Sequence, residues 1–446
     1  MTSVRSEPRR PPAAADSTLF EQVAQISRPL TADMDALIEQ IGDARFVLIG
    51  EASHGTHEYY RWRERLSRRL IAEKGFSFVA VEGDWPDCYA ITRYVKARPE
   101  ADRSARAVLN RFRRWPTWMW ANREVLEFVE WLRRWNDARD EGAKAGFYGL
   151  DVYSLWESLD EVLGYLRRVD PDAIGPALRA FRCFEPYGED VQGYARATLF
   201  VPATCEQEVV AMLAELRANA AEYAQDGREG YFCAEQNAIA ARNAERYYRA
   251  MIHGGTDSWN VRDRHMVETL ERLMQFHGPL AKAIVWEHNT HIGDAAFTDM
   301  AREGMVNVGQ LVRQQRGVDD VVLIGFGGHR GSVIAGDEWG APMQAMAVPP
   351  ARPESWEDVL HRAGSGNRLL LFGEGAETDE LLAQRGQRAI GVVYHPEFER
   401  WGNYVPTVLP RRYDAFLYFE ETRALHPLAL HPRNAGEPPE TYPWRV

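Results

Sequence analysis

Short apolar runs alternate along this chain with longer amphipathic stretches, and this alternation predicts its secondary structure. Mostly apolar runs bounded by glycine or polar residues are typical of strands buried in a sheet. They lie at 45–50, 76–81, 147–150, 281–285, 321–325, 368–372, 389–394 and 415–419. Between them, apolar residues recur at helical spacing. Buried strands that alternate with helices predict an α/β fold with a parallel or mixed central sheet flanked by helices.

The strand pattern is interrupted over residues 155–280, where helical spacing and a high content of Ala, Glu and Arg predict a large helical insertion or lid. The α/β core is therefore expected in two parts, at 18–154 and at 281–446, and the second part ends in a proline-rich C-terminal tail. Residues 1–17 are rich in Arg, Pro and Ala and lack a long apolar run. This composition predicts a disordered N-terminal tail and not a secretory signal.

Polar side chains follow five of the predicted strands at the point where each strand ends. They are Glu51 and His54, Glu82, Asp151, Glu287 and His288, and His329. Because the carboxyl ends of parallel strands meet at one edge of a sheet, we expect these side chains to lie close together. The sequence therefore predicts an active site at this edge.

The stretch 45–60 carries the most specific chemistry, because a strand, a polar turn and a helix follow one another and the turn contains Glu51, Ser53 and His54. Histidine can act as a base near neutral pH, and a carboxylate can fix its tautomer and orientation. In a purely structural interpretation, the turn only caps the helix, with Ser53 or Thr56 as the N-cap residue. We interpret His54 as a general base that activates water, with Arg63 on the next helix as a group that polarises a carbonyl.

Further residues are candidates for substrate binding. The five tryptophans between residues 111 and 136 either pack a core or line an apolar cleft for a bulky substrate. The charged residues within 258–266 form either a structural ion-pair network or part of the site. The substrate-binding candidates are Trp118, Trp120, Asp151, Glu287, His291 and His329.

A metal-dependent hydrolase is the first alternative function. His54 with His57, and His288 with His291, are spaced as possible ligand pairs that nearby carboxylates would complete. Neither pair has the H-E-x-x-H pattern of zinc hydrolases, and we expect no metal or other cofactor. A second alternative is a non-enzymatic protein whose aromatic cleft binds haem or another hydrophobic ligand. The chain lacks a Gly-x-Ser-x-Gly elbow, which argues against a serine hydrolase.

Composition narrows the possible partners. The 446 residues are 45% hydrophobic and 26% charged, as in ordinary globular proteins. A net charge of -12 argues against binding to nucleic acid or an anionic membrane, so the expected partner is a small molecule. No apolar run is long enough to span a membrane, and we expect a cytoplasmic protein. These features define no oligomeric state.

The cysteines of this chain are Cys88, Cys183, Cys205 and Cys233. They are widely spaced and form no C-x-x-C pair, so the sequence indicates neither a disulfide framework nor a zinc site. We therefore expect reduced thiols.

Five segments together resemble the erythromycin esterase family. They are 50–58 (GEASHGTHE), 82–86 (EGDWP), 258–266 (SWNVRDRHM), 286–292 (WEHNTHI) and 328–333 (GHRGSV). The segments follow one another in the family's order through nearly the whole chain after the N-terminal tail, which makes the resemblance specific.

The resemblance implies an α/β core with helical additions, a deep cleft, and hydrolysis of an ester or lactone. In characterised members the substrate is a macrolide lactone, whose opening would connect the chain with antibiotic resistance. The family activates water with the histidine of its Gly-Glu-x-x-His turn, without a covalent intermediate and without an obligatory metal. Carried over to this sequence, the implied catalytic residues are His54, Glu51, Arg63, Glu82 and His288.

Overall fold

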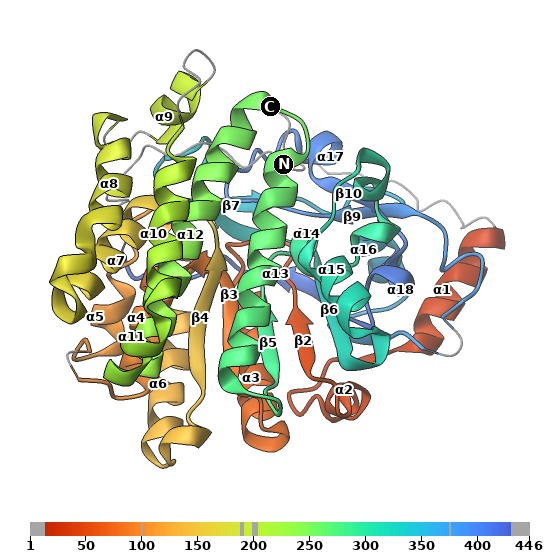
Figure 1. The fold of residues 1–446 in the computed structure, drawn as a ribbon. Helices are drawn as coiled ribbons and strands as arrows, with labels where there is room; N and C mark the ends of the chain where they lie inside the picture. The colour runs from red at the N-terminus through yellow and green to blue at the C-terminus, as the bar shows by residue number, and fades with distance from the viewer. Residues whose placement is uncertain (1–13, 100, 188–190, 199–203, 374–375, 430–446) are drawn as a thin grey trace.

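The computed structural model describes residues 14–99, 101–187, 191–198, 204–373 and 376–429. A mixed sheet lies at the centre of the molecule, with helices on both of its faces (Figure 1). Its strands are, from edge to edge, β1 (Ser27–Pro29), β8 (Arg368–Leu371), β11 (Ala415–Thr422), β6 (Val321–Ala335), β2 (Phe46–Ile49), β5 (Ala283–Trp286), β3 (Phe78–Asp84) and β4 (Gly146–Asp151). This arrangement confirms the predicted α/β fold with a mixed central sheet flanked by helices.

The strands from β11 to β4 run parallel to one another. Strands β1 and β8 add antiparallel pairs at one edge, and β7 (Gln344–Val348) pairs antiparallel with the far end of β6. In Figure 1 the arrows of β2 and β4 point to the upper side of the view, where the carboxyl ends of the parallel strands gather. That side of the sheet is therefore where the predicted strand-end residues converge.

The strand predicted at 389–394 is wrong. Strand β9 (Arg385–Arg388) ends just before this segment and pairs with β10 (Tyr404–Thr407) in a separate two-stranded sheet. The apolar segment itself makes only isolated bridges, one of them between Ile390 and Ser53 in the turn after β2. It is apolar because it is buried across that turn, and burial alone produces the same sequence pattern as a strand.

The helices outside the predicted insertion are α1 (Ala14–Ile26), α2 (Asp35–Ile41), α3 (His57–Lys74), α4 (Trp85–Val95), α5 (Ala105–Leu109), α6 (Arg123–Asp137), α14 (Asn289–Ile292), α15 (Val308–Arg316), α16 (Trp356–Arg362), α17 (Glu399–Gly402) and α18 (Leu409–Arg412). Helix α1 begins within the predicted N-terminal tail, and residues 1–13 of that tail lie outside the described residues, as do 430–446 of the C-terminal tail.

Two apolar cores lie on opposite faces of the sheet, because successive side chains of a strand point to opposite faces. In β2, Val47 and Ile49 join the core formed with helices α3 and α6. Phe46 and Leu48 join the core formed with α13 (Asp257–His277) and α15. All four side chains are almost fully buried. Burial on both faces explains why the strands are continuous apolar runs and not alternating ones.

The segment between β4 and β5 is helical throughout its described elements. Its further helices are α7 (Leu155–Val169), α8 (Gly175–Phe184), α9 (Val191–Thr198), α10 (Glu206–Ala218), α11 (Ala220–Asp226) and α12 (Arg228–His253). Buried residues of α7, α8, α10 and α12 share a third core of their own, and in Figure 1 these helices gather on the left of the sheet. Helix α13 differs, because it packs on the sheet and carries charged residues to the strand ends.

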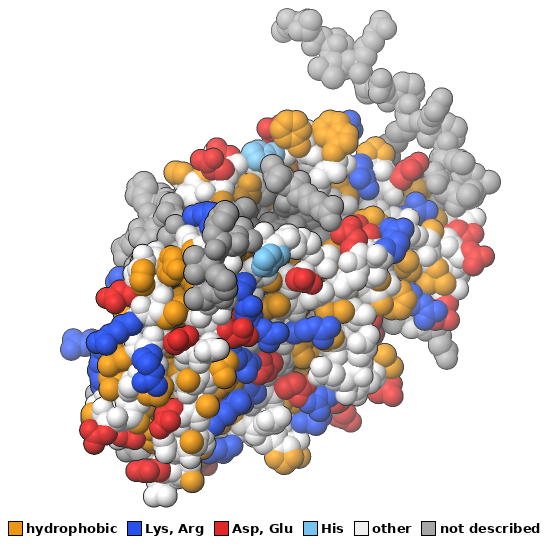
Figure 2. All heavy atoms as spheres, turned by 45° about the horizontal axis from the view of Figure 1, so that its top comes forward, with side chains coloured by type: hydrophobic (Ala, Val, Ile, Leu, Met, Phe, Trp, Pro, Cys, Tyr) orange, Lys and Arg blue, Asp and Glu red, His pale blue; other side chains and the backbone are white. Residues whose placement is uncertain are grey.

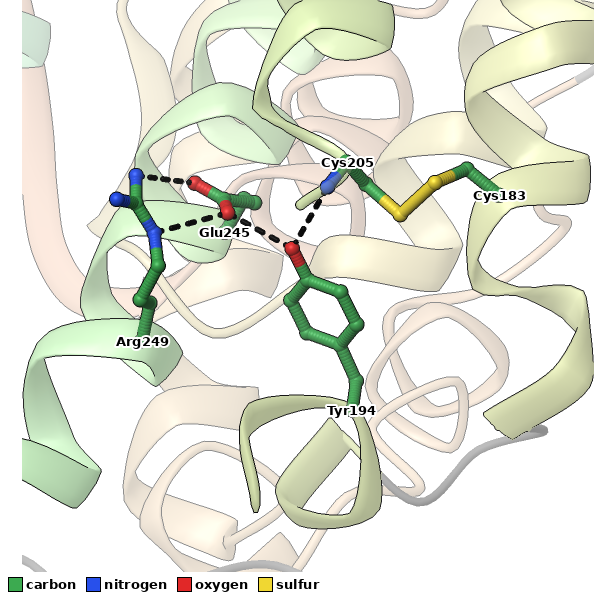
Figure 3. Close-up of a disulfide and its surroundings, with 5 residues drawn as sticks. All are labelled: Cys183, Tyr194, Cys205, Glu245 and Arg249. Atoms are coloured by element: carbon green, nitrogen blue, oxygen red, sulfur yellow. Dashed lines mark hydrogen bonds and ion pairs between the residues drawn. A yellow bond between two sulfur atoms is a disulfide. The ribbon is translucent and has the colours of Figure 1, made fainter. Parts of the chain in front are cut away.

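A disulfide between Cys183 and Cys205 corrects the prediction that all four cysteines are reduced thiols. Their Cα atoms lie 5.8 Å apart, which joins the end of α8 to the start of α10 (Figure 3). Tyr194 lies beside the disulfide, where its hydroxyl accepts a hydrogen bond from the backbone N–H of Cys205 and donates one to Glu245. The spacing of 22 residues gave no pairing signal, because the fold and not the sequence brings the two cysteines together. Cys88 and Cys233 are buried free thiols, as expected.

Across the described residues, no helix combines the length and the apolar character needed to cross a membrane.

The disulfide is expected to stabilise the helical unit by restricting its unfolded chain. For a closed loop of 22 residues, chain entropy predicts a loss of about 3 kcal/mol in the free energy of unfolding when both cysteines are replaced by serine. Denaturant unfolding of the wild type and of the Cys183→Ser/Cys205→Ser variant, each with and without a reductant, measures this loss. The reductant should lower the stability of the wild type only. An equal effect on both proteins would contradict the stabilising role.

Candidate active site

The turn after β2 places Glu51 and His54 at the carboxyl end of the sheet. Gly50 is required at its start, because a Cβ atom there would lie 2.1 Å from Oδ1 of Asn289. The turn is therefore packed directly against the segment that follows β5. This close approach brings two of the predicted strand ends together.

Glu51, His54 and Arg63 form one buried unit. Nδ1 of His54 lies 2.8 Å from Oε1 of Glu51, and Oε2 of Glu51 forms an ion pair of 2.8 Å with Arg63. Arg63 also donates hydrogen bonds to the backbone carbonyls of Gly50, at 3.0 Å, and Glu287, at 2.5 Å. An ionised carboxylate accepts the Nδ1 proton, which leaves the lone pair of the neutral imidazole on Nε2. Arg63 thus positions Glu51, and Glu51 positions the ring of His54.

Glu82, on β3, links this unit to the next strand ends. Its Oε2 accepts a hydrogen bond of 2.8 Å from the backbone N–H of His288, and its Oε1 forms an ion pair of 2.8 Å with Arg262. Burial alone would raise the pKa of Glu82, but the positive charges of His291 and Arg262, joined by His54 when that ring is protonated, outweigh burial and lower this pKa well below its usual value. Glu82 is therefore a buried anion held in a fixed position.

His288 lies beside His54, with ring centroids 4.9 Å apart. Its Nδ1 accepts the backbone N–H of Thr290 and thereby caps the short helix α14. Burial lowers the pKa of His288 well below its usual value, and the charge of His291, with that of His54 when its ring is protonated, adds to this effect against Glu82 and the Ala52 backbone. His288 is therefore neutral at physiological pH and carries its proton on Nε2.

His291 has the opposite charge state, although only three residues separate it from His288. Nδ1 of His291 lies 3.0 Å from Asp263, and Nε2 lies 3.4 Å from Glu82. Burial would lower the pKa of His291, but Asp263 and Glu82 raise this pKa well above its usual value. The ring also stacks on Trp259 at 4.5 Å. His291 is thus an imidazolium ion locked between two carboxylates.

Asp151 and Arg262 form a bidentate ion pair, with distances of 2.9 and 2.8 Å. Both side chains are buried. Arg262 and Asp263, the partner of His291, come from α13 within the helical segment 155–280. The charged stretch 258–266 is therefore both an ion-pair network and part of the strand-end cluster. Sequence analysis left these two interpretations open and did not name Arg262 or Asp263 as candidates.

Glu287 is completely buried, and its carboxyl oxygens make no hydrogen bond within the described part of the chain. Burial, with the nearby charges of Glu82 and Asp263, raises the pKa of Glu287 well above its usual value, in spite of His291. Glu287 is therefore a neutral carboxylic acid at physiological pH. Glu287 directly follows β5 and does not line the cavity beside the cluster, which was the expectation for a substrate-binding residue.

A narrow cavity of about 40 Å³ opens beside the cluster. Its walls include Glu82, Asp84, Arg114, Trp115, Trp120, Asp151, Arg262 and Trp339. Trp120 and Asp151, two of the predicted substrate-binding residues, thus line a cavity. Trp118, in the short helix η1 (Thr117–Met119), is fully buried in the core instead. Neither His54 nor His288 lines this cavity, and Glu82 connects it to them.

His329 is not part of this cluster in the described contacts. It lies far along the extended strand β6 and stacks on His361, with ring centroids 3.8 Å apart. Strand β6 was predicted to end at Gly325 but continues to Ala335. Because the strand continues, the residues after 325 do not form a strand-end turn, and His329 lies with α16 and β11.

The predicted metal pairs separate in a similar way. His57 lies with Glu124 and His426, and not with His54. Among the described residues, two sets of three potential ligands have donor atoms close enough to share an ion, His57/Glu124/His426 and His329/His361/Glu420. The arrangement of Glu51, His54 and Arg63 instead fits a hydrogen-bonded base.

Side chains of both charges intermingle on the face toward which the strand ends point (Figure 2). The site described above lies beneath such a surface, since its Glu51, His54, Glu82, His288 and His291 are each at most 3% exposed. Its charges are consequently little screened by solvent.

Known proteins with related sequences or folds identify the family. The erythromycin esterase family model matches residues 71–422. Erythromycin esterase type II of Escherichia coli is 24% identical over 364 residues, which cover 76% of this chain and 83% of that protein. A structure from Bacillus cereus is similar with a TM-score of 0.76 and 18% identity, covering 93% of this chain and 99% of that one. A mutant of erythromycin esterase EreC in its open conformation has a TM-score of 0.64 and 16% identity, covering 91% and 96%.

The chain is thus a hydrolase by class, since the family model covers most of its length. It belongs to the erythromycin esterase family, as its five motif segments implied. The likeness to the two solved structures supports the shared fold.

His265 of α13 contacts the backbone of Asp151, and its titration makes the stability of the folded protein depend on pH. Nδ1 of His265 accepts from Asn243 and Nε2 donates to the carbonyl of Asp151, so the neutral ring is fully bonded. Burial lowers the pKa of His265 to about 4, from 6.5, against the attraction of Glu268 and Asp151. The unfolded chain therefore binds more protons than the folded one between these two pH values, and stability falls as the pH falls through this window.

At pH 5, protonation of His265 in the unfolded chain should cost the wild type about 2 kcal/mol relative to pH 7. The His265→Gln variant keeps a donor and an acceptor but no titrating group, and it should lack this part of the pH dependence. Urea unfolding of both proteins at pH 7 and pH 5 measures the difference. Identical losses in the two proteins would contradict a neutral buried His265.

Proposed function

We propose that this protein hydrolyses carboxylic esters or lactones with water activated by His54, without a covalent intermediate and without a required metal ion. One observation supports this most directly. His54 is held by Glu51, and Glu51 by Arg63, in a buried arrangement that directs the basic Nε2 of the histidine away from its carboxylate partner. A base oriented in this way suits proton removal from water.

In the proposed reaction, Nε2 of His54 removes a proton from water while the water oxygen attacks the carbonyl carbon of the substrate. The carbonyl π bond breaks and its electrons form an oxyanion. The new imidazolium is stabilised by the ionised Glu51. When the tetrahedral intermediate collapses, the bond to the leaving alkoxide breaks, and His54 returns its proton to that oxygen. The products are a carboxylic acid and an alcohol, joined in one molecule when the substrate is a lactone.

We assign stabilisation of the oxyanion to His288. Its neutral ring carries a proton on Nε2, and it lies 4.9 Å from the ring of His54, measured between ring centroids. A neutral imidazole can donate a hydrogen bond to a developing oxyanion without first losing a charge. The short helix α14 and the Glu82 carboxylate fix the His288 backbone and ring.

The cavity bears on the size of the substrate. A volume of about 40 Å³ has room for a water molecule, whereas pockets for drug-sized ligands measure several hundred Å³. Binding of a macrolide or another bulky ester therefore requires its walls to move. Trp115 and Trp339 both line this wall, and their rings are 4.6 Å apart. The two residues come from segments that are distant in the sequence.

Replacement of His54 by asparagine should retain the fold and lower kcat by about 100- to 10,000-fold, because asparagine fills similar space but cannot accept the proton. A panel of esters and lactones, erythromycin included, is tested with mass spectrometry for addition of water. His253→Asn is the matched control, since His253 is exposed at the end of α12 and should leave kcat unchanged.

Glu51→Gln should also lower kcat, because it removes the charge that stabilises the His54 imidazolium.

Near-native turnover by the His54 variant on a substrate that the wild type hydrolyses would refute the assignment of His54 as the base. Activity that is lost with a chelator and restored by a metal ion would favour the metal-dependent alternative. Family membership favours a hydrolase over the haem-binding alternative.

The indole of Trp339 is expected to limit substrate size. Trp339→Ala removes a large, partly exposed side chain from the cavity wall and should raise kcat/KM for a bulky ester relative to a small one by about 10-fold. The ratio is measured with two esters of the same alcohol that differ in their acyl group. Trp401→Ala is the control, because Trp401 is 73% exposed and lies outside this wall. An unchanged ratio in Trp339→Ala would show that this wall does not select substrates.

A further inference from the structure

A second cluster of histidine and carboxylate side chains lies outside the proposed catalytic site. It consists of His329 on β6, His361 near the end of α16 and Glu420 on β11. We propose that these three residues bind a divalent transition-metal ion such as Zn²⁺. The proposal does not depend on the proposed esterase activity, because ion binding is measured directly.

The fold brings the three side chains together from separate elements. Strands β6 and β11 are parallel neighbours, with Phe419 paired to Gly328 and Glu421 to Arg330, so Glu420 is the cross-strand neighbour of His329. Helix α16 covers this position and supplies His361, whose ring lies parallel to that of His329 at 3.8 Å. One ligand atom from each of the three residues lies within 4.8 Å of the other two.

Two imidazole nitrogens in this cluster lack hydrogen bonds. His329 is 6% exposed, and its Nδ1 has no hydrogen-bond partner within the described residues. Nδ1 of His361 is 2.7 Å from Oε1 of Glu420 but also lacks a partner of hydrogen-bond geometry. Buried polar atoms in folded proteins are nearly always bonded, so an unmatched pair of nitrogens beside a carboxylate is the arrangement that a shared cation satisfies.

The protonation states suit metal binding, because imidazole binds an ion in its neutral form. Burial and the neighbouring His361 lower the pKa of His329 to about 4, with Glu420 opposing them and Arg388 and Arg330 adding to the effect. His329 is therefore neutral at pH 7. The positive charge of Arg388 is matched by an ion pair of 2.8 Å with Glu399, which limits its repulsion of a cation.

The surroundings hold the proposed ligands in place. The hydroxyl of Tyr418 donates a hydrogen bond of 2.9 Å to Oε2 of Glu420, which leaves Oε1 on the side of the histidines. Arg388 donates a hydrogen bond of 2.9 Å to the backbone carbonyl of His329. Partners that orient a ligand in this way are a common feature of metal sites.

The donor set favours zinc among biological cations. Two imidazoles and one carboxylate form a three-ligand set typical of Zn²⁺ with a fourth position for water, and oxygen-rich sites suit Mg²⁺ or Ca²⁺ instead. Tetrahedral zinc needs donor atoms about 3.4 Å apart, so the present separations require only small rotations of the side chains. His361 and Glu420 are 32% and 26% exposed, which gives an ion a route from solvent.

The other three-residue cluster is a useful contrast. His57 and His426 both bond through Nδ1 to the same oxygen of Glu124, at 2.5 and 2.6 Å. Hydrogen bonds already satisfy these nitrogens, so the same residue types form a closed network there. His426, which is about half exposed, can therefore be replaced as a matched control for non-specific binding to histidine.

The test uses the full chain, stripped of metal with a chelator, desalted and titrated with Zn²⁺ by calorimetry. We expect one ion per chain. His361→Asn and Glu420→Gln should each weaken binding by about 100-fold or more, and Tyr418→Phe by about 10-fold, because loss of an orienting partner alone costs 10- to 100-fold. His426→Asn should bind zinc as the wild type does. Circular dichroism confirms that each variant is folded.

Three results would overturn the proposal. They are absence of zinc binding by the wild type, unchanged affinity in the folded His361→Asn and Glu420→Gln variants, and loss of binding in His426→Asn. The Tyr418→Phe variant separates a ligand-orienting role from a packing role, because it removes only the hydroxyl group. If it lowers thermal stability without changing zinc affinity, Tyr418 does not position Glu420, and that part of the proposal fails.

Discussion

The buried guanidinium of Arg63 is the interaction on which the proposed catalytic site depends. A charge in a protein interior is tolerated only where partners replace the water it has lost. Arg63 is 0% exposed, and its partners are the carbonyls of Gly50 and Glu287 and the carboxylate of Glu51. These groups belong to two different strand ends, so the requirement to satisfy one arginine fixes the turn after β2 against the end of β5. The orientation of His54 follows from this constraint through Glu51.

A similar requirement joins the helical segment to the sheet. Arg262 on α13 meets Asp151 and Glu82, and Asp263 on the next position meets His291. Each positive charge therefore lies between carboxylates contributed by other elements. Removal of one member would leave a buried charge without a partner, which is costlier than loss of the whole pair. Helix α13 is consequently part of the scaffold of the proposed site, although the rest of its segment forms a separate apolar core.

Sequence reasoning identified the strand ends because that information is local. An apolar run followed by glycine and polar residues locates Glu51 and His54 without knowledge of the fold, and the parallel sheet then brings Glu82, Asp151 and His288 to the same side. Sequence reasoning failed where the position of a side chain depends on contacts with distant segments of the chain. The length of β6 is set by pairing with β7 and β11, which moved His329 to another neighbourhood. The pairing of Cys183 with Cys205, and the contribution of Arg262, likewise depend on how helices meet in space.

Burial produces two kinds of group within the site. Glu82 and His291 are charged because oppositely charged neighbours outweigh the effect of burial on the pKa of each, whereas His288 and Glu287 are neutral because burial prevails. The charged groups hold the strand ends in place, and the neutral His288 is available to donate a proton in a hydrogen bond. In the proposed mechanism, water activation is thus organised before any substrate binds. The same proposal assigns selection among substrates to a different part of the structure, the aromatic wall that includes Trp115, Trp120 and Trp339. Under this proposal, a change in that wall alters which ester fits without disturbing the ion pairs around His54, so members of one family can share a reaction and differ in substrate.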